Sequence, residues 1–183
     1  MALEDDLRRV ADAAITYADR EEELAGIVPA EPSDGARAYL CAFSSPTHGA
    51  RWLVLDDVGH AVDDRARVRE VVSIAALCEL AEEVAGGGDL DELLSQLVAL
   101  RVTENPPGID EAEEAAQELQ LAIGAPPRVA TPQHLDSVGA ATRRLEQALG
   151  DGGSPFATAM KEAFATVAEL TRDVESNYKR PLD

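Results

Sequence analysis

Residues 37–57 read RAYLCAFSSPTHGARWLVLDD, and this stretch decides the fold. Its two ends, 37–43 and 51–57, are rich in the aromatic and branched side chains that are typical of β-strands. Pro46 and Gly49 between them mark a loop, because proline and glycine interrupt regular structure. The stretch therefore predicts an antiparallel β-hairpin.

Both faces of this hairpin are apolar. Successive side chains of a strand point to opposite faces, which sorts the first strand into Tyr39, Cys41 and Phe43 against Ala38, Leu40 and Ala42. We expect the chain's own helices to cover both faces. Two alternatives remain for one face: a dimer interface, or a small-molecule pocket lined by Tyr39, Phe43 and Trp52.

The segment after the hairpin, DDVGHAVDD (56–64), has two interpretations. In the first it is a turn: Asp56 and Asp57 accept backbone hydrogen bonds, and Gly59 adopts a positive φ. Residues 61–62 then begin a short third strand, and Asp63 or Asp64 caps the next helix. In the second interpretation, acidic side chains and a histidine converge on a divalent cation, or a carboxylate orients the histidine for acid/base chemistry. The candidate ligands are Asp56, Asp57, His60 and Asp64.

The N-terminal segment is expected to form an amphipathic helix. Apolar residues recur at spacings of three and four from Leu3 onward, and the pattern continues towards Leu24. Gly26, Pro29 and Pro32 then end the helix. Residues 1–34 are therefore predicted to be one helix followed by a linker.

Residues 63–183 carry apolar stripes that predict a bundle of four or five helices. Glycines at 86–88, prolines at 126–127 and the short connection at 150–154 separate them, and the last connection predicts an antiparallel pair. The fold class is thus α+β and predominantly α: an N-terminal helix, a small antiparallel hairpin or three-stranded meander at 35–62, and the bundle. One domain of 183 residues is the expectation.

Charge argues against nucleic acid as a partner. The chain has 16 Lys and Arg against 35 Asp and Glu, a formal net charge of −19, whereas binding a phosphate backbone requires clustered cations. No apolar run is long enough to span a membrane, and the acidic N-terminus is unlike a secretory signal. Cys41 and Cys78 lie in separate apolar segments, which favours two reduced thiols. We therefore expect a cytoplasmic protein.

Motifs for catalysis or a cofactor are absent from the sequence. There is no paired-histidine metal spacing and no nucleophile elbow of the G-x-S-x-G type, so we expect no cofactor and lean against an enzyme. Two sets of glutamates share helical faces and are expected to be solvated, Glu79, Glu82 and Glu83 and then Glu111, Glu114 and Glu118. Lys179 and Arg180 are interpreted as cations favoured at the end of the last helix.

The leading hypothesis is a non-enzymatic interaction or regulatory domain that self-associates, as a homodimer, or binds another protein. Residues 125–183 are nearly neutral, with seven Lys or Arg against eight Asp or Glu, and interface cores are depleted in charge. The hairpin is the other candidate interface. The alternatives are a small-molecule or metal-binding protein using the sites above, and an acidic mimic that binds a basic partner.

Overall fold

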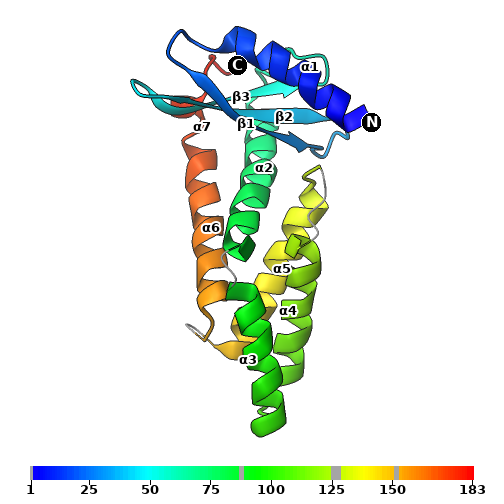
Figure 1. Cartoon of the computed structure of the whole chain (residues 1–183). Coiled ribbons are helices and arrows are strands. Elements are labelled where there is room, and N and C mark those ends of the chain that lie inside the picture. Colours follow the sequence, from blue (N-terminus) through cyan, green and yellow to red (C-terminus); the bar gives the residue numbers. More distant parts are fainter. Residues whose placement is uncertain (1, 87–88, 125–128, 151–152) are drawn as a thin grey trace. The chain divides into compact units, whose positions relative to one another are not determined.

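The computed structural model describes residues 2–86, 89–124, 129–150 and 153–183. Residues 87–88 of the glycine connection predicted at 86–88, the proline pair at 126–127 and part of the last connection, 151–152, lie outside the described residues. The elements follow the order α1 (Ala2–Tyr17), β1 (Glu23–Ala30), β2 (Ala38–Ser45), β3 (Gly49–Asp56), α2 (Arg65–Gly86), α3 (Asp89–Thr103), α4 (Ile109–Gly124), α5 (Pro132–Leu149), α6 (Pro155–Arg172) and α7 (Val174–Asn177) (Figure 1). The prediction of a mostly helical α+β fold is confirmed.

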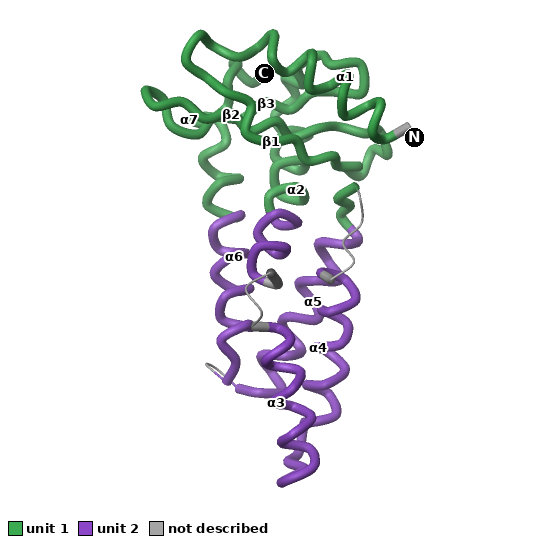
Figure 2. Tube along the Cα trace, viewed as in Figure 1, with its two compact units in different colours: residues 1–76, 128–132, 168–183 green, residues 77–127, 133–167 purple. Residues whose placement is uncertain are grey.

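The chain divides into two compact units (Figure 2). The sheet unit comprises Met1–Ala76, Arg128–Pro132 and Ala168–Asp183, and the helical unit comprises Leu77–Pro127 and Gln133–Val167. Folding as a single domain stays a prediction. None of the helices in the described ranges combines the length and apolar content that crossing a bilayer requires.

The sheet unit contains three antiparallel strands in the order β1-β2-β3. The predicted hairpin is β2 and β3, paired from Ala38↔Asp56 to Ser45↔Gly49. The prediction that the N-terminal helix runs towards Leu24 is wrong, because α1 ends at Tyr17 and residues 23–30 form β1. The third strand thus precedes the hairpin, and at the predicted place, 61–62, only an isolated bridge joins Ala61 to Leu55.

The physical reason for this error is that β1 is an edge strand. Gly26 and Pro29 disfavour a helix, and in the sequence they indicate a linker. An edge strand accepts both, since no further strand of the sheet pairs with its outer side and a bulge can absorb the glycine. The register does shift between Leu24 and Gly26.

The central strand, β2, is buried on both faces. Tyr39 and Cys41 from one face and Ala38 from the other are fully buried. In Figure 1, α1 lies over one face of the sheet and α2 starts beneath the other. Cover by the chain's own helices is therefore confirmed, and the hairpin leaves no large apolar surface open on β2.

Short segments from distant parts of the sequence pair with both edges of the sheet, and along β1 they do so only at its C-terminal end. Along β1, the backbone of Ala130 donates to the Pro29 carbonyl (2.9 Å) and accepts from the Glu31 amide (2.8 Å). Along β3, the Lys179 amide donates to the Trp52 carbonyl (2.9 Å). Paired edge groups do not offer a template for another strand, so these contacts protect the sheet against edge-to-edge association.

The turn after β3 follows the first interpretation of its sequence. One carboxylate oxygen of Asp56 accepts the amides of Val58 (3.0 Å) and His60 (2.8 Å), and Gly59 has a φ of 91°. The carboxylate of Asp64 accepts the amide of Arg67 (2.7 Å), which confirms it as the cap of α2.

The helical unit buries a core contributed by α2, α3, α4, α5 and α6. Its fully or nearly fully buried members include Leu93, Leu97, Ala115, Leu119, Leu145, Phe156 and Met160. Helices α5 and α6 form the predicted antiparallel pair, because Gly139 approaches Phe164 while Glu146 pairs with Lys161. The last helix is shorter than its apolar stripe, since α6 ends at Arg172 and α7 holds Val174 separately.

We expect Gly59→Ala to destabilise the protein more than Gly35→Ala. Both glycines have positive φ, 91° and 72°, so each substitution introduces backbone strain of about 1 kcal/mol. Only at Gly59 would the new methyl overlap a neighbour, at 2.7 Å from the Cβ of Ala13 in α1, which adds about 1–3 kcal/mol. Urea unfolding of both variants measures the difference, and equal losses would contradict the contact between this turn and α1.

Candidate functional site

The three aromatic residues predicted to line one pocket do not lie together. Residues directly opposite each other in an antiparallel pair share a face. Trp52 is opposite Ala42, whereas Tyr39 and Phe43 point to the other face. Tyr39 is fully buried and burial raises the pKa of its phenol. Phe43 is also buried in the core, whereas Trp52 on the other face is only half-buried. A ligand pocket at these three residues stays a prediction.

The predicted metal ligands Asp56, Asp57 and His60 lie in and beside the turn that follows β3. His60 is exposed, with Nδ1 3.8 Å from the second carboxylate oxygen of Asp56, whose first oxygen holds the turn. Asp57 is exposed, and its carbonyl accepts a hydrogen bond from Arg9 (2.7 Å). Across the described residues, no group of three or more His, Cys, Asp or Glu side chains is placed to hold a metal ion. A metal site at Asp56, Asp57 and His60 stays a prediction.

Sequence reasoning missed a cluster of charges in the sheet unit. Glu22 accepts hydrogen bonds from the Arg51 guanidinium, from Lys179 Nζ and from the Asp19 amide (2.9 Å). The side chains of Glu22 and Lys179 are only 1% and 5% exposed, and Lys179 Nζ lies 4.7 Å from the centre of the Phe43 ring. Lys179 therefore anchors the C-terminal tail to the sheet, and its predicted role as a cation at a helix end is corrected.

These partners hold the pKa of Glu22 at about 2. Burial by itself raises the pKa of a carboxyl, since it disfavours the charged form. The hydrogen bonds from Asp19, Lys179 and Arg51 outweigh that effect and lower the pKa from 4.5. The cluster acts as a structural clamp, because each of its buried charges is paired.

Neither cysteine forms a disulfide. Burial raises the pKa of the Cys41 thiol to about 12 and that of Cys78 to about 11. Thiolates are the nucleophilic form, so both side chains are unreactive at neutral pH, in keeping with the predicted reduced thiols.

The glutamates of α4 hold one arginine. Glu111, Glu114 and Glu118 each pair with Arg144 of α5, at 2.7, 3.0 and 2.7 Å. Their hydrogen bonds raise the pKa of that guanidinium. These carboxylates therefore join two helices at the surface. The other set of glutamates, Glu79, Glu82 and Glu83 of α2, is exposed to solvent as expected.

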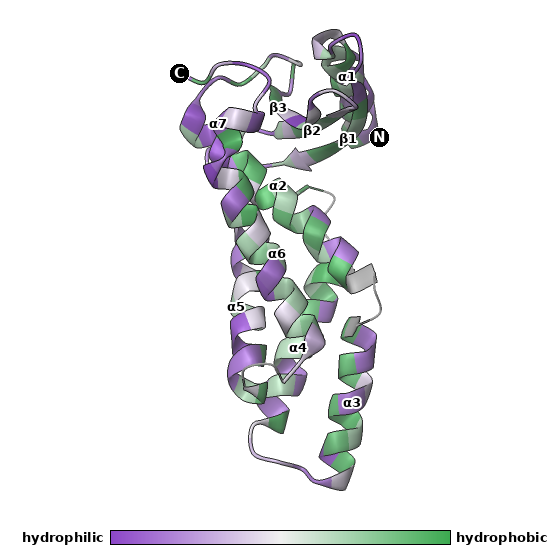
Figure 3. Cartoon of the chain, turned by 90° about the vertical axis from the view of Figure 1, so that its left-hand side faces the viewer, coloured by the Kyte–Doolittle hydropathy of each residue, from purple (hydrophilic) through white to green (hydrophobic). Residues whose placement is uncertain are grey.

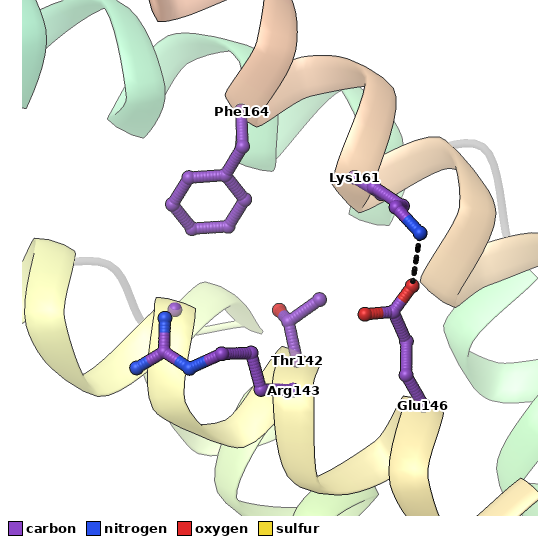
Figure 4. Close-up of a pocket in the computed structure, with 6 residues that line it drawn as sticks. Thr142, Arg143, Glu146, Lys161 and Phe164 are labelled. Carbon is purple, nitrogen blue, oxygen red and sulfur yellow. Dashed lines mark ion pairs between the residues drawn. The ribbon is translucent and has the colours of Figure 1, made fainter.

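A pocket of ≈ 250 Å³ lies between α5 and α6 in the helical unit (Figure 4). It is lined by Gly139, Thr142, Arg143, Glu146, Lys161 and Phe164. Figure 4 shows the Phe164 ring facing Thr142 across the opening, with the Lys161–Glu146 ion pair (3.5 Å) on one side. The pocket therefore combines an aromatic wall with two cationic side chains.

Comparison with protein-family models, with curated proteins and with solved structures finds no match for this chain. Function is therefore inferred from the residues and their geometry.

The charge cluster predicts a loss of stability in acid. Because the pKa of Glu22 is about 2 when folded and 4.5 ordinarily, its contribution is present above pH 4.5 and is lost as pH falls towards 2 and below. The loss is about 3 kcal/mol in the free energy of unfolding. Urea unfolding across this pH range measures it, and in Glu22→Gln the loss should shrink while its exposed neighbour Glu23→Gln behaves as wild type.

A titration of Glu22 in the unmodified protein measures its pKa without any substitution. The carboxyl ¹³C resonance of Glu22 in the unmodified protein should stay that of a carboxylate down to about pH 3. A midpoint near 4.5 would contradict the clamp.

Proposed function

We propose that the protein is a non-enzymatic interaction domain that self-associates through the C-terminal half of α3. The observation that carries this proposal is the exposure of two valines on that helix, 55% for Val98 and 81% for Val102. They are four residues apart, so they lie on one side of the helix as adjacent members of a stripe. We call this pair the α3 valine stripe.

The α3 valine stripe has no role in the core of its own unit. Leu90, Leu93 and Leu97 are the residues of α3 that turn into the helical core. Bands of apolar residues run along α3 in Figure 3. Valine is a weaker helix former than alanine or glutamate because its branched side chain loses freedom in a helix, so two exposed valines there stabilise neither the helix nor the core.

The interface first expected at residues 125–183 has no comparable surface. The large apolar side chains that are exposed in the described residues are Ile15, Val58, Val98, Val102 and Leu121, and all precede that region. The low charge of 125–183 instead reflects packing, since Val138, Leu145, Phe156 and Met160 are buried in the helical core. We therefore assign the interface to α3.

The partner in this proposal is a second copy of this chain, which buries the same apolar stripe. Near the α3 valine stripe, Arg101 pairs with Asp110 and Glu113 of α4, so its charge is already balanced within the chain. Two copies of a chain with a net charge of −19 repel each other. Salt screens that repulsion, so self-association should strengthen as ionic strength rises.

We expect Val98→Ser/Val102→Ser to weaken self-association by at least roughly tenfold, because the variant removes the apolar area that the interface buries. The control is Val58→Ser, which changes a valine of similar exposure, 61%, in the turn of the sheet unit. Sedimentation velocity over a range of protein and salt concentrations measures the monomer–dimer equilibrium. A monomer at every concentration would overturn the proposal.

The dependence on salt concentration also distinguishes self-association from the alternative, an acidic mimic that binds a basic partner. Docking of a basic protein on an acidic surface weakens as salt increases, whereas dimerisation through the α3 valine stripe strengthens. A basic partner bound only at low salt, with no effect of the valine variant, would favour the mimic.

A further inference from the structure

The pocket between α5 and α6 is lined by two cationic side chains and one carboxylate, that of Glu146, in a strongly acidic chain. Arg143 and Lys161 come from different helices and both line it. Arg143 is exposed and has no ion pair among the described residues, so its guanidinium donors are accessible to a ligand that enters from solvent. These donors are arranged in a planar fork that fits a carboxylate.

The second cation is held weakly. Lys161 pairs with Glu146 at 3.5 Å, and its side chain is largely exposed. Exposed pairs of this kind contribute little, typically below about 1 kcal/mol, because water and salt screen them. An incoming anion can therefore share Lys161 without disrupting a strong interaction.

Gly139 and Phe164 form the apolar part of the pocket. A methyl group on Gly139 would lie 3.4 Å from both the Phe164 ring and the Arg143 guanidinium. Glycine in the middle of a helix costs about 1 kcal/mol relative to alanine, and here it keeps the space between ring and cation open. An aromatic ligand can pack against Phe164 in that space.

Thr142 contributes no hydrogen-bond donor to a bound carboxylate. Its hydroxyl is buried and donates to the Val138 carbonyl (2.8 Å), so its oxygen remains as an acceptor only. A volume of ≈ 250 Å³ lies below the usual range for drug-sized ligands and suits a single ring.

We propose that this pocket binds a small aromatic carboxylate. The carboxylate accepts both hydrogen bonds of the Arg143 fork, the ring packs on Phe164, and Lys161 contributes a second charge. This site is independent of the proposed self-association, since none of its lining residues belongs to α3.

Benzoate and its neutral isostere benzamide test the proposal on the unmodified protein. Amide chemical shifts at Gly139, Arg143, Lys161 and Phe164 should move saturably with benzoate. Benzamide should bind at least roughly tenfold more weakly, because it lacks the charge that strengthens the hydrogen bonds to Arg143. Equal binding of the two probes, or no saturable shift in the pocket, would overturn the proposal.

Substitutions of two arginines test whether benzoate binds in this pocket. Arg143→Met should lower benzoate affinity roughly tenfold to a hundredfold, the loss expected for a charge-assisted pair. Arg8→Met is the matched control, because Arg8 is an exposed arginine on α1 in the sheet unit. Both positions are exposed, so both variants should fold, which circular dichroism verifies. An equal loss in Arg8→Met would show that benzoate binds through general charge and not in the pocket.

Discussion

The apolar character of both faces of β2 is the constraint on which the rest of the sheet unit depends. A strand with Tyr39 and Phe43 on one side and Ala38 and Leu40 on the other is stable only between two layers. The chain supplies α1 for one face and the start of α2 for the other (Figure 1). Because a three-stranded sheet still has two open edges, residues from far along the chain close those as well.

The closing of the β3 edge explains why charges are buried there. Tyr178 and Lys179 reach the sheet after all the helices, and the Tyr178 hydroxyl donates to the Val62 carbonyl (2.6 Å) and accepts the Val54 amide (3.1 Å). Lys179 then meets Glu22 and the Phe43 ring. A buried ion pair gains little over an apolar contact but strongly disfavours any arrangement that leaves one charge alone. The cluster therefore specifies where the tail lies.

Local patterns in the sequence predicted the local structure. The hairpin, the turn at Gly59 and the cap at Asp64 follow from residues within a few positions of one another. The strand β1 was missed because Gly26 and Pro29 mark a helix end and an edge strand alike. The contact of Glu22 with Lys179 joins residues 157 positions apart, and no spacing rule reports it. The α5–α6 pocket depends on which turns of the two helices face each other; Gly139 within a helix was its one local sign.

The C-terminal tail completes the sheet, and hydrogen exchange tests this role most directly. In the unmodified protein the Val54 amide should exchange as slowly as the amides of β2, because the Tyr178 oxygen accepts it in a buried place. In Tyr178→Phe, which keeps the ring, the Val54 amide should lose protection by roughly tenfold or more, while the β2 amides remain protected. Rapid exchange at Val54 in the unmodified protein, or no change in the variant, would contradict the account.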